Sequence, residues 1–144
     1  MSSHKAGDVF QAKRPYTSRK DGLDAKNRYF VYFGRSSILD TPVYYYLNST
    51  TTQDIESKKE IYKNAYIEFQ YEKGRFPSHC ILILEQIDPK LESFFDEYNL
   101  EYQFSMNDEE IKLLLQRLDN ADISPIIQKD IKASFERDRE ITCK

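Results

Sequence analysis

The stretch Val43-Tyr44-Tyr45-Tyr46-Leu47 runs directly into Asn48-Ser49-Thr50-Thr51-Thr52-Gln53, and this change of character says more about the chain than any other segment. Aromatic and β-branched residues fit a pleated, half-buried surface, so residues 43–47 predict a strand with one face on a core. Small hydrogen-bonding residues cannot continue such a strand. They predict a turn whose hydroxyls and backbone amides face a ligand, although an ordinary polar turn has the same composition.

Five further segments predict strands on either side of this one in the sequence. They are residues 9–13, 29–33, 65–72, 80–84 and 100–104. Residues 80–84 are apolar on both faces, which predicts the central, buried strand of the sheet, and the alternating residues 100–104 predict an edge strand. Residues 54–63 fit either a short helix or an irregular connection.

Two helix signals follow the strands. Asn107 with Glu110 three residues later has the pattern of a capping box, and Ser124-Pro125 is a typical helix start. With 144 residues and 40% hydrophobic content, the chain suits one domain. Strands followed by helices predict an α+β fold, in which a small β-barrel or sandwich over residues 7–105 carries two C-terminal helices over residues 107–138.

Charge is distributed unevenly along the chain. The net charge is −3, yet residues 1–35 hold eight basic and three acidic residues, whereas residues 88–124 hold three basic and ten acidic ones. A basic N-terminal face can attract polyanions such as nucleic acid. An uneven surface that is merely solvated would give the same counts.

Several classes of protein are disfavoured by composition. No apolar run reaches the length of about 18 residues that crosses a bilayer, and the N-terminus lacks the apolar part of a secretory signal, so we expect a cytoplasmic protein without a membrane segment. Cys80 lies in an apolar run and Cys143 is penultimate, and we expect no disulfide. Two cysteines and two histidines give no metal-ligand spacing, and we predict neither a metal nor a cofactor.

Three charged or titratable residues near strand ends could carry chemistry. Arg28 heads a strand, where a guanidinium suits a phosphate or the charge that develops on it, but a surface ion pair is the alternative. Glu85 ends the apolar strand, where its carboxylate is either a desolvated base or the partner of a cation such as Arg28. His79 is either a general acid near neutral pH or a hydrogen-bonded structural residue.

Four segments together resemble the MazF/PemK family of toxin endoribonucleases. Gly7-Asp8-Val9-Phe10 is similar to the family's opening strand, and residues 27–33 are similar to its Arg-Pro-hydrophobic strand, with Tyr29 where proline is usual. Thr50-Thr51-Thr52-Gln53 resembles the family's Thr-Thr-Gln or Thr-Ala-Gln turn. Residues 80–87 are similar to its strand ending in (Asp/Glu)-Gln-(Ile/Val). The four segments keep the family's order and spacing over about residues 7–90.

The resemblance implies a small SH3-like barrel, usually a homodimer, that cuts single-stranded RNA without metal and is held in check by an antitoxin protein. The family's catalytic arginine corresponds to Arg28 and its catalytic threonine to Thr51, and Glu85 falls where some members carry a functional carboxylate. In this reaction the 2′-hydroxyl attacks the adjacent phosphate and leaves a cyclic phosphate and a 5′-hydroxyl end.

RNA contacts are predicted from three regions: the polar turn, the long basic loop over residues 14–27, and the start of the apolar strand. A few of the tyrosines, such as Tyr16 or Tyr45, could also stack on exposed bases. The predicted RNA-binding residues are Arg14, Tyr16, Arg19, Lys20, Ser49, Thr50, Thr52, Gln53 and His79.

The chain also departs from the family pattern. The family's Gly-Ser-Glu-Gln stretch is missing from the first long loop, and Asp88-Pro89 replaces a basic residue that often follows the Gln-(Ile/Val) pair. These differences leave two alternatives open. One is a barrel that binds RNA or protein without cutting RNA, and the other is a structural subunit that uses its acidic helices as an interface.

Overall fold

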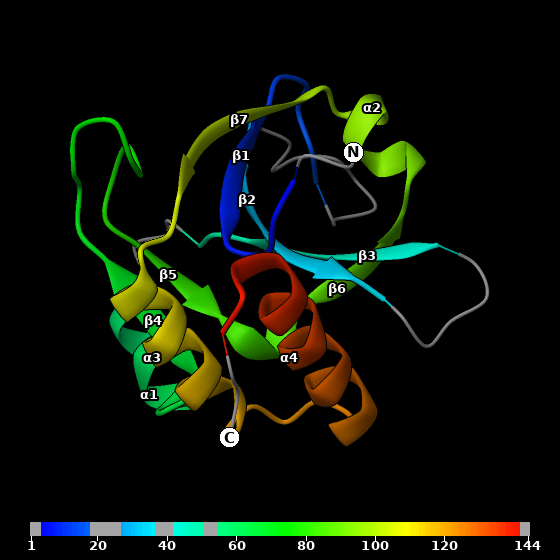
Figure 1. Ribbon diagram of the computed structural model, residues 1–144. Coiled ribbons are helices and arrows are strands. Elements are labelled where there is room, and N and C mark those ends of the chain that lie inside the picture. The colour runs from blue at the N-terminus through cyan, green and yellow to red at the C-terminus, as the bar shows by residue number, and fades with distance from the viewer. Residues whose placement is uncertain (1–3, 18–26, 37–41, 51–54, 142–144) are drawn as a thin grey trace.

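The computed structural model describes residues 4–17, 27–36, 42–50 and 55–141 (Figure 1). These residues form a mixed α+β fold around a five-stranded antiparallel sheet with the strand order β6-β3-β2-β1-β7. Its strands are β1 (Asp8–Ala12), β2 (Tyr29–Arg35), β3 (Val43–Asn48), β6 (Asp88–Leu91) and β7 (Leu100–Ser105). A separate hairpin consists of β4 (Tyr66–Phe69) and β5 (Cys80–Ile83). The helices are α1 (Ile55–Tyr62), α2 (Ser93–Glu97), α3 (Asp108–Leu118) and α4 (Pro125–Arg139), with a 3₁₀ turn, η1 (Leu84–Gln86).

Both faces of the five-stranded sheet are covered, because its strands alternate between two cores. Tyr45 and Leu47 of β3 face the larger core, which also contains buried residues of α3 and α4, whereas Tyr44 and Tyr46 face a second, aromatic core beneath α2. In Figure 1 the long helices α3 and α4 and the short helix α2 lie on different sides of the sheet. The sequence pattern predicted strands with one buried face, whereas both faces of these strands are buried.

The prediction that residues 80–84 form the central strand is wrong. The middle strand of the five-stranded sheet is β2, and β5 pairs with β4 in the separate hairpin. β5 is nevertheless completely buried, because Cys80 and Leu82 belong to the larger core while Ile81 and Ile83 pack against Ile55 of α1. Burial on both faces arises here from helices and strands above and below, and not from a central position.

The predicted edge strand and both C-terminal helices are confirmed. β7 pairs only with β1 at one edge of the sheet. Asn107 and Glu110 form the capping box at the start of α3, and the Ser124 side chain accepts a hydrogen bond from the Ile126 N–H at the start of α4. Residues 54–63, for which two structures were open, contain the helix α1.

Residues 88–97 hold two elements that the sequence did not predict. β6 (Asp88–Leu91) pairs with the edge of β3, and α2 covers the aromatic core through the buried Phe94. Proline is unusual within a sheet, and Pro89 is tolerated because β6 is an edge strand. The acidic residues in this segment concealed both elements, because charge and proline ordinarily indicate a loop.

The sheet does not close on itself. Its link to the β4–β5 hairpin within the described residues is an isolated bridge, in which Thr50 and Ile81 exchange backbone hydrogen bonds of 2.9 and 3.0 Å. β6 pairs with β3, and β5 is bridged to Thr50, which follows β3 in the chain. Since η1 joins β5 to β6, the two strands lie one after the other along the same edge. None of the helices in the described part of the chain has the length and apolar character that crossing a membrane requires.

Helix α4 is fixed to the sheet by a close contact at Gly34. Gly34 has a φ of +104°, and a Cβ atom added there would lie 2.1 Å from Cβ of Ser134. Ser134 donates a hydrogen bond of 2.9 Å to the Arg35 carbonyl. On the same helix, Asp130 accepts a hydrogen bond of 2.8 Å from the hydroxyl of Tyr45. Burial, together with this bond, raises the pKa of Tyr45 to about 12.

We expect Gly34→Ala to lower the free energy of unfolding by about 3 kcal/mol for two reasons. A residue with a Cβ is strained at this positive φ, and the added Cβ would clash with helix α4. Gly74→Ala is the matched control. Gly74 also has a positive φ, of +82°, but nothing lies within 4 Å of the added Cβ, so we expect a loss of about 1 kcal/mol. Urea denaturation measures both values. Equal losses would contradict the close packing of α4 on β2.

Candidate functional site

The register between β2 and β3 brings the start of one strand beside the end of the other. Phe30 pairs with Asn48 and Val31 pairs with Leu47. One step further, the Ser49 N–H donates a 3.0 Å hydrogen bond to the Tyr29 carbonyl. Arg28, the residue before β2, therefore lies next to the polar residues that follow β3.

A pocket of about 200 Å³ opens at this corner of the fold. Arg28 is the one charged side chain among the described residues that line it, and hydroxyl and amide groups supply most of the other polar contacts. Its described lining residues are Gln11, Asn27, Arg28, Tyr29, Ser49, Phe76, Pro77 and Ser78. A single cation among neutral donors and acceptors suits an anionic, hydrogen-bonding ligand.

The Arg28 side chain is half-buried, and a hydrogen bond to the backbone fixes its position. Its Nε donates a 3.0 Å hydrogen bond to the Tyr16 carbonyl. Tyr16 is fixed in turn, because its ring makes edge contacts with Phe30, Phe94 and Tyr98 in the aromatic core. The aromatic core thus positions the guanidinium at the pocket.

Both tyrosines proposed as stacking platforms have packing roles in the structure. The Tyr16 hydroxyl accepts a 3.3 Å hydrogen bond from Lys90, whose ammonium lies 5.5 Å from the centre of the Tyr16 ring. Tyr45 is only 2% exposed, so the prediction that it could stack on RNA is wrong. The tyrosines of β3 alternate between the two cores, and their rings fill space in both.

The other predicted site residues in the basic loop and the polar turn fall into three groups. Arg14 is exposed and donates a 3.2 Å hydrogen bond to the carbonyl of Glu97, away from the residues that line the pocket. Ser49 lines the pocket, and Thr50 follows it in the bridge to Ile81. The remaining predictions lie outside the described residues, namely Thr51, Thr52, Gln53, Arg19 and Lys20.

Glu85 is not among the residues that line the pocket. Its Oε2 accepts a 2.9 Å hydrogen bond from the Asp122 N–H, in the connection between α3 and α4. The carboxylate therefore holds a turn on the helical side of the molecule. The structure does not bring Glu85 together with Arg28.

His79, directly after the pocket residue Ser78, is held in an ion-pair cluster. Its Nε2 lies 2.5 Å from a carboxylate oxygen of Glu68, and the other oxygen of Glu68 lies 3.1 Å from Nζ of Lys59 on α1. The hydrogen bond from His79, followed by the one from Lys59, holds the pKa of Glu68 below its usual value. The hydrogen bond to Glu68 raises the pKa of Lys59.

The depressed pKa of Glu68 predicts how pH affects the stability of this cluster. The carboxylate contributes stability above the ordinary value of 4.5, and this contribution is lost as pH falls through the lower pKa of the folded state. We expect Glu68→Gln to be less stable than wild type at pH 7 and the gap to close in acid. Glu60→Gln, at an exposed site on α1, is the control. Urea titrations between pH 7 and pH 3 measure the difference, and a gap independent of pH would contradict the prediction.

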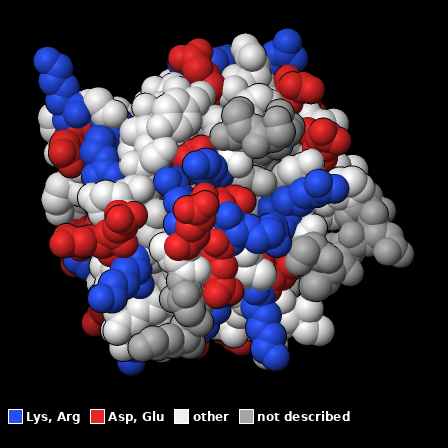
Figure 2. Space-filling view, in the orientation of Figure 1, with Lys and Arg blue, Asp and Glu red and all other residues white. Residues whose placement is uncertain are grey.

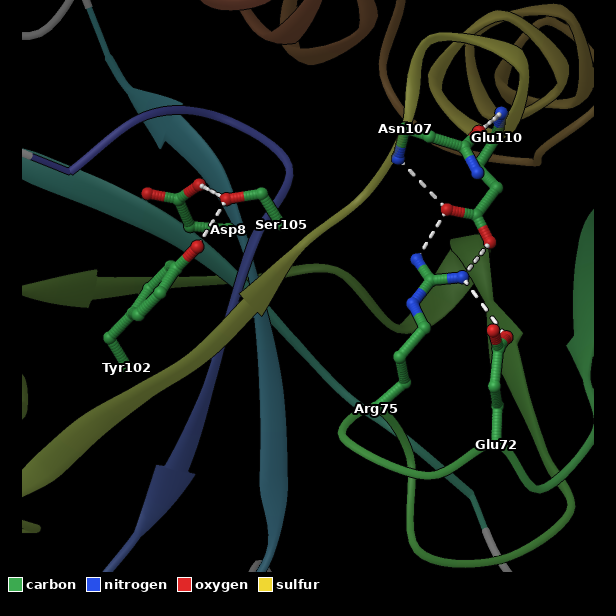
Figure 3. Close-up of polar contacts among 7 residues, drawn as sticks. All are labelled: Asp8, Glu72, Arg75, Tyr102, Ser105, Asn107 and Glu110. Atoms are coloured by element: carbon green, nitrogen blue, oxygen red, sulfur yellow. Dashed lines mark hydrogen bonds and ion pairs between the residues drawn. The ribbon is translucent and has the colours of Figure 1, made fainter.

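One wall of the pocket is anchored by a residue that the sequence did not single out. Arg75 precedes the lining residues Phe76 and Pro77, and it forms a two-pronged ion pair with Glu110 of α3, with distances of 2.8 and 2.5 Å (Figure 3). The Arg75 guanidinium also lies 4.6 Å from the centre of the Phe104 ring. Arg75 and Glu110 are 35 residues apart, and an arginine in a turn carries no local signal of its partner.

We expect Arg75→Met to lower the free energy of unfolding by about 2 kcal/mol, because it leaves the half-buried Glu110 carboxylate without its partner. Lys73→Met removes an exposed cation from the same turn and should change stability by less than about 0.5 kcal/mol. Urea denaturation distinguishes the two variants. If Arg75→Met costs no more than Lys73→Met, the ion pair does not anchor the turn.

The charge pattern and the comparisons add two findings. Figure 2 shows acidic and basic side chains interspersed over the face that carries α3 and α4, so that face has no uniform charge. No cluster of three or more His, Cys, Asp or Glu residues suited to a metal ion occurs within the described ranges. The sequence matches no known protein-family model and no curated protein.

Proposed function

We propose that this chain is an endoribonuclease of toxin–antitoxin type, similar to MazF/PemK enzymes, that cleaves single-stranded RNA without a metal ion. The observation that carries the proposal is the shared pocket of Arg28 and Ser49, directly beside Thr50 and the threonines that follow it in the sequence. A half-buried guanidinium anchored by the Tyr16 carbonyl is well suited to a phosphate group.

The reaction follows from the groups that RNA itself supplies. The 2′-oxygen of the nucleotide before the cut bonds to phosphorus and gives up its proton, the phosphorus–O5′ bond breaks, and O5′ takes up a proton. Arg28 stabilises the negative charge that builds on the phosphorane oxygens. By the resemblance, Thr51 assists proton transfer. The products are a 2′,3′-cyclic phosphate and a 5′-hydroxyl end.

The proposal includes an SH3-like barrel, a homodimer and an antitoxin protein as partner, in the cytoplasm. The Thr50–Ile81 bridge supports a barrel, because it continues the β3 edge onto the β4–β5 hairpin, and residues of the sheet and of the hairpin share the larger core. The exposed sides of α3 and α4, where acidic and basic side chains are interspersed, and the open edges of the sheet would be the surfaces available to protein partners.

The second candidate function is an RNA- or protein-binding module that has the pocket but not the chemistry. The observation in its favour is the lack of a general acid or base: no carboxylate or imidazole is among the described residues that line the pocket, and Glu85 bonds to Asp122 elsewhere. Saturable, salt-sensitive RNA binding without products would support this alternative.

We expect the purified protein to cut a long single-stranded RNA in the presence of EDTA, and Arg28→Ala to reduce the rate on the order of 100- to 1,000-fold. Arg35→Ala is the matched control, since Arg35 is an exposed arginine at the opposite end of the same strand. Its rate should stay within about twofold of wild type. Both rates are measured from the loss of full-length RNA on a denaturing gel.

Two outcomes would contradict the nuclease proposal. Intact RNA at high enzyme concentration, across varied sequences, would favour the binding module. An equal loss of rate in Arg28→Ala and Arg35→Ala, with both variants folded by circular dichroism, would show that Arg28 has no special role.

A further inference from the structure

A second pocket lies at the other end of β1 and is not used by the proposed reaction. Its volume is about 450 Å³, and its described lining residues are His4, Lys5, Asp8, Tyr102, Ser105 and Arg139. These residues come from the N-terminal segment, the edge strand β7 and the end of α4. β1 contributes Asp8 to this pocket and Gln11 to the Arg28 pocket.

Asp8 is the fixed centre of this second pocket. It is only 6% exposed, and its Oδ1 accepts hydrogen bonds from Ser105 Oγ at 2.7 Å and from Arg139 Nη2 at 3.0 Å. Its Oδ2 accepts a 3.0 Å bond from the Lys5 N–H. The Arg139 guanidinium offsets the negative charge of Asp8, and the Ser105 hydroxyl and the Lys5 N–H satisfy its remaining hydrogen bonds. An anion can therefore bind in the pocket beside this carboxylate.

The hydroxyl groups of Ser105 and Tyr102 form a directed chain toward Asp8 (Figure 3). Tyr102 Oη and Ser105 Oγ are 2.7 Å apart. Since the single hydroxyl proton of Ser105 is donated to Asp8, the Tyr102 hydroxyl must donate to Ser105. The Tyr102 oxygen then presents only lone pairs to the pocket, and Tyr102 is 53% exposed, so a ligand can reach it.

Hydrogen-bond donors face the same space. Arg139 Nε is used by the Ala6 carbonyl and Nη2 by Asp8, and within the described residues neither Arg139 Nη1 nor the Lys5 ammonium has a partner. Among the described residues that line the pocket, Lys5 and Arg139 outnumber the one carboxylate, Asp8. His4 Nδ1 is buried and also unpartnered among the described residues, and burial lowers the pKa of His4, which favours a neutral ring.

We propose that this pocket binds a phosphate group that keeps a titratable P–OH proton, either as a phosphate monoester or as inorganic phosphate. Lys5 and Arg139 bind its anionic oxygens, and the Tyr102 oxygen accepts a hydrogen bond from a protonated P–OH group. Carboxylates, sulfate and phosphodiesters are ionised at neutral pH and have no such proton to donate. A phosphate monoester has a second pKa near 6 and keeps one proton over part of the physiological range.

The test is calorimetric titration of the full chain at pH 6 with inorganic phosphate, a ribonucleoside 5′-monophosphate and sulfate. We expect saturable binding of phosphate, of the nucleotide or of both, and at least tenfold weaker binding of sulfate. Preference for the nucleotide would identify an organic phosphate as the ligand, and preference for inorganic phosphate would identify the free anion. Either result supports the proposal.

Variants locate the binding. Lys5→Ala should weaken phosphate binding on the order of tenfold, because it removes a charge-assisted hydrogen bond from an exposed residue. Tyr102→Phe keeps the ring and removes the acceptor, so it should reduce the preference for phosphate over sulfate. Lys112→Ala, an exposed lysine on α3, is the control and should bind like wild type.

Three results would overturn the proposal: no saturable binding of either phosphate ligand, equal affinity for sulfate, or loss of binding in Arg28→Ala but not in Lys5→Ala. The last result would assign the anion to the Arg28 pocket. Phosphate binding in Arg28→Ala that equals wild type, together with the loss in Lys5→Ala, supports a separate site. This outcome does not depend on whether the chain cuts RNA.

Discussion

The register between β2 and β3 is the constraint on which the Arg28 pocket depends. Phe30 pairs with Asn48, and the ladder extends to the hydrogen bond between Ser49 and Tyr29, so Arg28 lies beside Ser49 and Thr50. A slip of one residue would turn every side chain of β3 to the opposite face. The two cores oppose that slip, because Tyr44 and Tyr46 fill one core and Tyr45 and Leu47 fill the other.

The sequence predicted what depends on local pattern. Local pattern located four of the five strands of the sheet, all except β6, and the Asn107–Glu110 pair located α3. Their positions at strand ends singled out Arg28 and Ser49, which both line the pocket. Pairing between distant segments has no local signal. The sequence of β5 therefore suggested a central strand, although the strand belongs to the hairpin. In the same way, the position of Glu85 at the end of that strand did not show that its side chain bonds to Asp122 and lies outside the pocket.

The residues that were missed are those whose partners lie far away in the chain. Arg75 bonds to Glu110, and Asp8 joins Ser105 and Arg139 across 97 and 131 positions. Each pocket depends on one of these long-range contacts. Arg75 anchors a wall of the Arg28 pocket, and Asp8 lies at the centre of the second pocket. Helix α4 packs on the sheet through the close contact at Gly34 and ends at Arg139 in the second pocket. The fold therefore carries two separate pockets with basic lining residues on one framework.

The most direct measurement of the proposed chemistry uses the substrate and not the enzyme. A single-stranded RNA that the protein cuts is compared with the same sequence in which the nucleotide before the cut carries a 2′-deoxy sugar, both in EDTA. If the RNA supplies the nucleophile, the all-ribose strand yields a 2′,3′-cyclic phosphate and a 5′-hydroxyl end, and the deoxy strand stays intact at that position. Cleavage of the deoxy strand at the same bond, or 5′-phosphate ends, would contradict a reaction in which Arg28 stabilises a phosphorane formed by the 2′-oxygen.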